Sequence, residues 1–170
     1  MSGRAELDLA WRMHDAAAAA IDKADTKAGL AATVETALAV VVLTLVSQSH
    51  GAPLGVRVLF GVSLVALAVA LGSSLLVVVP RLHRPADALV PGEFLYFGAV
   101  RRRSVEQLHH HIAPKSAGET VIDPLVAVTH QAERLADIAW TKHEWLRVSF
   151  LAVVSGVVFT VAGVLLGGAR

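Results

Sequence analysis

One acidic residue stands out because of its position in the sequence. Glu35 is the only acidic residue within three long apolar segments of the chain. A charged residue at the centre of a bilayer costs on the order of 2.5 to 3.5 kcal/mol, so such residues are candidates for function. Two interpretations are open. Glu35 either makes a polar contact inside an oligomer or pore, or is a tolerated acid that reaches headgroup water, is protonated, or pairs with an interfacial basic residue.

Basic residues gather at one edge of the same segments. Lys27, Arg81 and Lys142 each lie about one helical turn from the end of a different apolar segment. Arg84 and Arg147 are close to them in the sequence and complete a basic collar. Such a collar either anchors lipid phosphates or binds an anionic ligand.

Aromatic residues follow the second apolar segment. Tyr96 and Phe97 offer flat faces on which a nucleobase can stack, which would suit a phosphorylated ligand bound at the collar. The run Arg101–Arg103 could serve the same anion. Neighbouring residues on a helix point about 100° apart, however, so a solvated surface also explains this run.

The sequence contains no residue pattern typical of an enzyme. It lacks a Gly-rich phosphate loop, a nucleophile elbow, and a helix with two histidines around a glutamate. The adjacent His109–His111 indicate a solvated helix end, with metal binding or pH sensing as the alternative. There is no cysteine, which excludes disulfides and thiolate metal sites. We therefore predict neither catalysis nor a cofactor.

Three apolar segments must position these residues. Hydrophobic residues make up 55% of the 170 residues and charged residues 17%, a balance typical of membrane proteins. Each segment is long enough to cross a hydrocarbon core of about 30 Å as a helix. The sequence thus predicts an all-α integral membrane protein with three transmembrane helices at residues 30–48, 56–79 and 146–168.

Lys and Arg residues predict how these helices are oriented. Thirteen of the 15 lie before residue 28 or between residues 80 and 147, and the remaining two are Arg57 and Arg170. Cytoplasmic loops carry such an excess of basic residues. We therefore expect residues 1–29 and 80–145 in the cytoplasm. The first apolar segment lacks a short basic start and a cleavage site, so no targeting segment is expected.

Both cytoplasmic regions are expected to be helical extensions of the spans. Apolar residues recur at helical spacing over residues 7–28, including Trp11, and one helix is predicted from about residue 6 to 46. Asp123 and Pro124 are typical of a helix start, and an apolar stripe then continues to the third span. The resulting stalk helix and a helical insert make up residues 80–145.

The insert is predicted to contain two short helices. The first lies around residues 94–100. Ser104 and Gln107 form a capping-box pattern that opens the second, from Val105 to Ile112. Residues 114–120 are expected to form a loop.

Small residues at four-residue spacing allow helices to approach closely in lipid. Some of these faces should be used within one chain, and enough remain to favour a homo-oligomer. The small residues form three sets. The first is Ala66, Ala70 and Ser74, the second is Ala152, Gly156 and Thr160, and the third is Gly163 and Gly167.

Four short motifs and one lysine occur in a fixed order relative to the spans. They are Asp25-Thr26-Lys27-Ala28, Pro80-Arg81, Phe94-Leu95-Tyr96-Phe97-Gly98, Leu135-Ala136-Asp137-Ile138 and Lys142. In this order the chain resembles the transmembrane effectors of bacterial Pycsar anti-phage systems, the PycTM family. The resemblance covers nearly the whole chain.

The resemblance implies a sensor in the bacterial inner membrane. An infection-activated cyclase would make cUMP or cCMP, the cytosolic part would bind it, and the spans would then damage the membrane. The alternatives are a related small effector or scaffold that responds to another messenger or a protein partner, and a ligand-free structural protein. Membrane lipid and further copies of the chain are the expected partners, and nucleic acid is not.

The predicted site residues come from the basic collar and the aromatic residues, not from the family. Glu35 is expected to act within the membrane. The residues expected to contact the nucleotide are Asp25, Lys27, Arg81, Tyr96, Phe97 and Lys142.

Overall fold

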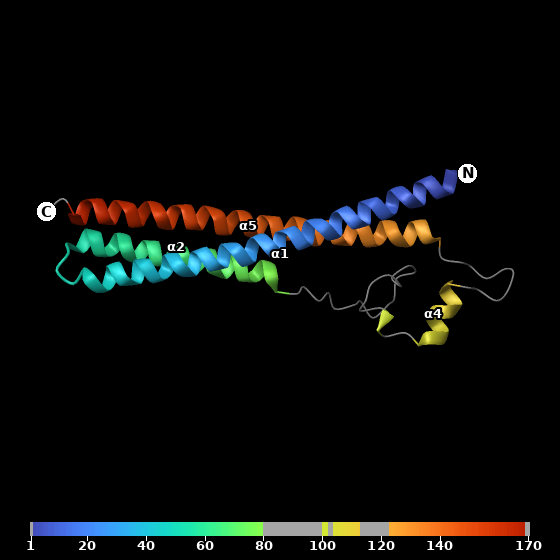
Figure 1. Ribbon diagram of the computed structural model, residues 1–170, viewed down its shortest axis with the longest axis horizontal. Helices are drawn as coiled ribbons and strands as arrows, with labels where there is room; N and C mark the ends of the chain where they lie inside the picture. Colours follow the sequence, from blue (N-terminus) through green and yellow to red (C-terminus); the bar gives the residue numbers. More distant parts are fainter. Residues whose placement is uncertain (1, 80–99, 102–103, 113–122, 169–170) are drawn as a thin grey trace. The chain divides into compact units, whose positions relative to one another are not determined.

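Helices account for most of the described chain. The computed structural model describes residues 2–79, 100–101, 104–112 and 123–168, and no strand occurs within these ranges. The helices are α1 (Ser2–Gln48), α2 (Leu54–Val78), α4 (Val105–Ile112) and α5 (Pro124–Gly168) (Figure 1). The prediction of an all-α chain is confirmed.

Three of these helices, α1, α2 and α5, are long and apolar enough to cross a membrane. In the most apolar part of each helix, only 11%, 33% and 17% of the residues are buried, so most of their apolar side chains face outward. That distribution is expected where lipid rather than water surrounds the helices. The architecture is that of a multi-pass membrane protein, and α2 is its most enclosed span.

The helices α1 and α5 extend well beyond the length of a span. They contain 47 and 45 residues, whereas about 20 residues suffice to cross the hydrocarbon core. No break interrupts either helix, so the predicted continuity of the first and third spans with a flanking helix is confirmed. The α1 helix begins at Ser2, a few residues earlier than predicted.

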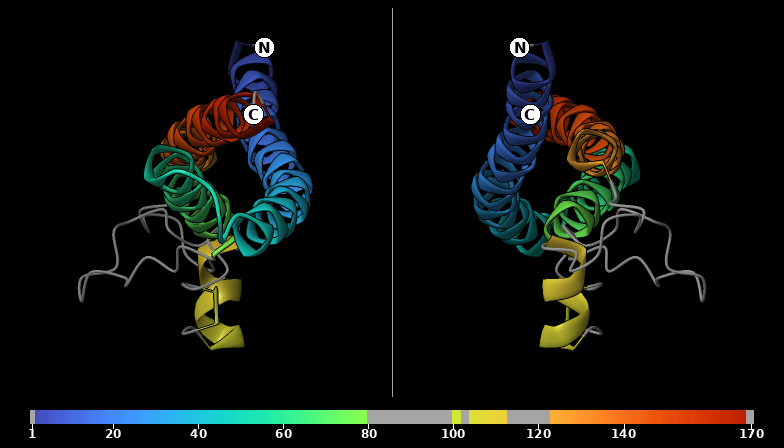
Figure 2. Two further views of the ribbon diagram at one scale, coloured as in Figure 1. Left: turned by 90° about the vertical axis from the view of Figure 1, so that its left-hand side faces the viewer. Right: turned by 90° about the vertical axis from the view of Figure 1, so that its right-hand side faces the viewer.

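The membrane-spanning helices form a three-helix bundle. This compact unit consists of residues 22–80 and 140–170. Val42 of α1 packs in one apolar cluster with Phe60 and Leu67 of α2. A second cluster contains Ala24 and Ala28 of α1, Val77 of α2, and Trp145 and Leu146 of α5. Each helix therefore packs against the other two, as the end-on views also show (Figure 2).

Glycines allow α2 and α5 to approach closely. A Cβ added at Gly163 would lie 2.8 Å from Cε1 of Phe60, and one at Gly156 would lie 3.1 Å from Cγ of Leu67. Ser63 lies on the same face and donates a hydrogen bond to the Gly156 carbonyl oxygen at 2.8 Å. The small residues of the third span are thus used within one chain, as expected for part of this set.

The other compact unit comprises residues 1–21 and 81–139. Its α5 segment buries Val128, Ala132 and Ala139, which confirms the apolar stripe. In the α1 segment of this unit, Trp11 is 40% exposed and Ala10 beside it is buried. The Trp11 ring lies edge-on to His14 of its own helix.

Side chains cap the helices of this unit where the sequence predicted them. The backbone N–H of Gln107 donates to Ser104 Oγ, and that of Ser104 donates to Gln107 Oε1, which completes the capping box of α4. The Glu106 carboxylate accepts hydrogen bonds from a backbone N–H and from Ser104, which lower its pKa. At α5, Asp123 Oδ1 accepts from Leu125 N–H at 2.9 Å. The predictions for residues 94–99 and for the loop 114–120 lie outside the described residues.

The contact at Gly163 predicts a difference between two Gly→Ala variants. In Gly163→Ala the added methyl forces Phe60 to move, which should destabilise the bundle by about 1 to 3 kcal/mol. Gly72→Ala is the matched control, because nothing lies within 4 Å of its added Cβ. Denaturant unfolding in mixed micelles, followed by circular dichroism, measures both. Equal stability of the two variants would contradict the close packing of α2 on α5.

Candidate functional site

The side chain of Glu35 joins the three spans. It is 1% exposed. Its Oε1 accepts hydrogen bonds from Ser74 Oγ of α2 at 3.1 Å and from Ser149 Oγ of α5 at 2.5 Å. The two hydroxyl oxygens are 3.0 Å apart. A single carboxylate oxygen therefore links α1 to both other helices, and we call these three residues the Glu35 cluster.

Hydrogen-bond donors are scarce in the Glu35 cluster. Each serine hydroxyl carries one proton, so two protons serve three close oxygen–oxygen contacts. The second carboxylate oxygen of Glu35, Oε2, is buried and has no hydrogen-bond partner among the described residues. An unpartnered buried polar atom costs about 1 to 3 kcal/mol. The cluster thus holds the helices together and still has an unused acceptor.

The partners of Glu35 differ from those considered for it in the sequence. The structure places its polar contacts inside a single chain, while a role in an oligomer or pore stays a prediction. Sequence reasoning noted Ser74 only as a small residue and did not consider Ser149. A useful signal was present, because all three residues lie a few positions from the same edge of their spans.

Two of the predicted ligand residues pair with each other. The ammonium group of Lys142 donates a hydrogen bond to Asp25 Oδ1, which joins α5 to α1. Lys142 is 5% exposed, whereas the side chain of Asp25 is 38% exposed. A buried ammonium needs such a partner, because removing the acid would leave the charge uncompensated. The structure therefore brings these residues together as a link between two helices.

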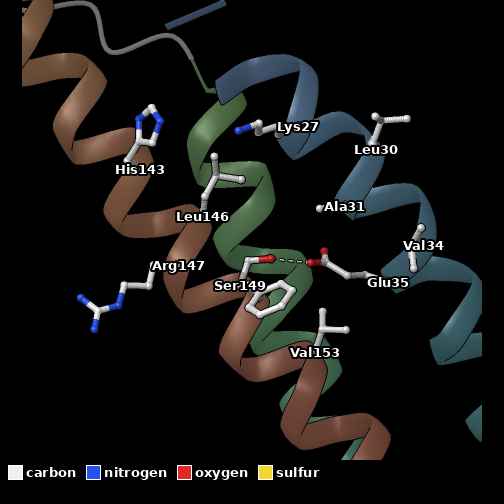
Figure 3. A pocket seen from close by; sticks show the side chains of 11 residues that line it. Lys27, Leu30, Ala31, Val34, Glu35, His143, Leu146, Arg147, Ser149 and Val153 are labelled. Carbon is white, nitrogen blue, oxygen red and sulfur yellow. Dashed lines mark hydrogen bonds between the residues drawn. The ribbon is translucent and has the colours of Figure 1, made fainter. Parts of the chain in front are cut away.

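Lys27 lies at a groove between α1 and α5 with a volume of about 570 Å³. We call it the α1–α5 groove. Figure 3 shows Lys27 near one end, Val153 near the other, and the Glu35–Ser149 hydrogen bond between them. Its lining residues are Lys27, Leu30, Ala31, Val34 and Glu35 of α1, and His143, Leu146, Arg147, Ser149, Phe150 and Val153 of α5.

The remaining predicted ligand residues are not located by the structure. Arg81, Tyr96 and Phe97 lie outside the described residues, as do Arg84 and the side chains of His110 and His111. Within the described ranges, no group of three or more His, Asp or Glu residues is placed to hold a metal ion.

The Glu35 cluster predicts unequal effects of two Ser→Ala variants on one helix. Ser149→Ala removes a donor to a buried carboxylate and should destabilise the bundle by about 1 to 3 kcal/mol. Ser155→Ala is the matched control, because the Ser155 hydroxyl is exposed and donates to the Leu151 carbonyl oxygen of its own helix, not to another helix among the described residues. Unfolding in mixed micelles compares their free energies. The cluster would be energetically unimportant if both variants had the parental stability.

The comparisons with known proteins identify the family. The model of the Pycsar effector protein domain, PycTM, matches residues 9–168. This match covers nearly the whole chain, including all three spans, so the chain belongs to the Pycsar effector family. No curated protein and no solved structure matches the chain.

Proposed function

We propose that this member of the Pycsar effector family binds a cyclic pyrimidine nucleotide, cUMP or cCMP, and then disrupts the inner membrane. Membership of the family implies a membrane effector in anti-phage defence. The family match over residues 9–168 is the observation that carries the proposal. The architecture supports it, since three apolar helices are joined to long helical extensions that a soluble ligand can reach.

The charge distribution supports a cytoplasmic location for the nucleotide site. Thirteen of the 15 Lys and Arg residues flank one side of the three spans. This excess assigns the amino terminus and residues 80–145 to the cytoplasm of the bacterial cell. A nucleotide made by a cytoplasmic cyclase would then meet the extensions of α1 and α5 without crossing the membrane.

The continuity of α1 and α5 gives ligand binding a route to the spans. Both helices run without a break from their extensions into the bundle, so no linker has to transmit a shift. The Glu35 cluster and the Lys142–Asp25 pair are polar contacts that join α1 to α5. A shift of either helix would disturb both contacts. To convert a population from about 1% to 99% active, the nucleotide must favour the active state by about 5.5 kcal/mol.

The nucleotide contacts remain a proposal in which the residues have different roles. Asp25 and Lys142 already pair, so they would act by positioning α1 against α5. Arg81 is the proposed phosphate contact, and Tyr96 and Phe97 provide stacking faces for the base. Lys27, also predicted from the sequence as a ligand residue, lies in the α1–α5 groove, whose walls are mostly apolar. No catalytic role is proposed for any of them.

A homo-oligomer is the proposed active form. Many large apolar side chains of the spans remain exposed on the single chain, including Val65, Val69 and Val158. Some small residues also lie on open faces, since nothing is within 4 Å of a Cβ added at Gly61 or Gly72. These features permit close association of further copies in the membrane.

Nucleotide specificity tests the proposed ligand directly. Detergent-purified protein should bind cUMP or cCMP more tightly than cAMP, cGMP or cyclic oligonucleotides, as measured by calorimetric titration. Arg81→Ala should weaken binding about ten- to a hundredfold, because it removes a charge-assisted bond to phosphate. Arg57→Ala controls for loss of positive charge on the opposite side of the spans. Equal affinity for purine and pyrimidine nucleotides would refute the proposed ligand class.

Glu35→Gln tests whether the Glu35 cluster holds the resting bundle. Glutamine keeps an acceptor for the two serine hydroxyls, but hydrogen bonds to a neutral oxygen are weaker than those to a carboxylate. The variant should insert and bind nucleotide, yet release dye from liposomes at nucleotide concentrations lower by about fivefold or more.

The liposome comparison requires equal amounts of parent and variant in the membrane, because a variant that inserts more easily would release more dye through dose alone. Leak without nucleotide serves as the baseline for each protein. If leak at matched abundance follows the same nucleotide dependence in both, Glu35 is a tolerated acid with no part in activation.

A further inference from the structure

The α1–α5 groove combines a basic end with apolar walls. Lys27 lies at one end, and Arg147 lines the α5 side (Figure 3). The walls are formed by side chains that are largely apolar, and Leu30 and Phe150 remain 67% and 68% exposed. The groove therefore lies on the flank of two membrane-spanning helices, where lipid is the surrounding medium.

Two basic residues of the groove, Lys27 and Arg147, have no anionic partner within the described part of the chain. Lys27 and Arg147 form no salt bridge there, in contrast to Lys142, which pairs with Asp25. Basic pockets between transmembrane helices on the cytoplasmic side commonly bind lipid headgroups. Lysine and arginine near helix ends also extend their charged groups toward the headgroup layer.

We propose that the α1–α5 groove is a phospholipid-binding site, in which Lys27 contacts the phosphate and one acyl chain lies along the apolar walls. Arg147 extends outward from α5 on the side away from Lys27 (Figure 3), so the phosphate contact is assigned to Lys27 alone. The volume of about 570 Å³ lies within the range of sites that bind small molecules. The occupant is thus a bilayer lipid with an anionic phosphodiester.

A cyclic nucleotide shares the phosphodiester but fits the groove poorly. Its sugar and base carry several polar groups, and Leu30, Val34 and Val153 offer them no hydrogen bonds. Burying such groups against apolar side chains without partners costs free energy, whereas an acyl chain gains from the same contact. The groove chemistry therefore favours the lipid. Assigning Lys27 to lipid leaves Arg81 as the proposed nucleotide contact.

The unused oxygen of Glu35 lies beside the groove but is closed off from it. Glu35 lines the groove and is 1% exposed, and its Oε2 has no partner in the described residues. Figure 3 shows its carboxylate between α1 and α5, below Ala31. Because Oε2 has almost no exposed surface, a lipid in the groove is not expected to contact it, and this acceptor stays unused while the bundle is closed.

Native mass spectrometry of the full chain tests this site with phosphatidylglycerol as the probe and phosphatidylcholine as the comparison lipid. We expect one tightly held phosphatidylglycerol per chain. Lys27→Ala should weaken its binding about ten- to a hundredfold. Ala31→Phe should also reduce binding, because the larger side chain fills the groove. The matched controls are Arg57→Ala, at the opposite end of a span, and Ala37→Phe, an exposed position outside the groove lining.

Three outcomes would overturn the proposal. Parental phosphatidylglycerol binding in both Lys27→Ala and Ala31→Phe would show that lipid does not use this groove. Equal losses in the control variants would show general association with the spans. Displacement of the bound lipid by cUMP or cCMP, one for one, would assign the phosphodiester contact at Lys27 to the nucleotide. Because Lys27 is exposed, its replacement should leave the fold intact even if Ala31→Phe disturbs packing.

Discussion

A carboxylate buried among membrane-spanning helices has to obtain its hydrogen bonds from protein, and this requirement organises the bundle. Glu35 finds two serine hydroxyls, one on each of the other spans, and both donate to the same carboxylate oxygen. Hydrogen bonds are directional and short, whereas apolar contacts tolerate sliding and rotation. The cluster therefore fixes the rotation and depth of three helices that otherwise present similar apolar surfaces to one another. Removing any member changes the relation between all three.

Other contacts in the bundle agree with the register that the Glu35 cluster requires. Toward one end of the bundle, Lys142 of α5 pairs with Asp25 of α1, two helices that the Glu35 cluster also joins. Toward the other, Gly163 lets Phe60 approach α5, and Ser63 bonds the α5 backbone. In lipid, helices gain no hydrophobic free energy by associating, because the lipid tails are as apolar as their side chains. Close packing of the backbones and interhelical hydrogen bonds hold the helices together instead. The bundle uses both, at successive depths along α5.

The sequence predicts the helices well because their causes are local. Apolar length determines the spans, and the Ser104–Gln107 capping box forms from residues three positions apart. The contacts of Glu35 depend instead on how three helices rotate about their axes, and an apolar segment that is hydrophobic on every face carries little information about rotation. The start of α1 illustrates the same limit, because both Ala10 and Trp11 fit a helical apolar spacing within one residue, yet Ala10 is buried and Trp11 is 40% exposed.

The shortage of donors in the Glu35 cluster gives the proposed activation a physical direction. Among the described residues, one carboxylate oxygen of the cluster has no hydrogen-bond partner, and two hydroxyls share their protons among three contacts. Water admitted between the helices would supply the missing donors and so offset part of the cost of separating α1 from α5. The apolar cluster of Ala24, Ala28, Trp145 and Leu146 opposes this change, because its contacts lose area when α1 and α5 part. A ligand that strains the extensions of α1 and α5 would thus act on a bundle whose polar centre favours hydration and whose apolar layers resist it. That balance would suit the proposed function, in which the protein stays closed without its messenger and opens the membrane in its presence.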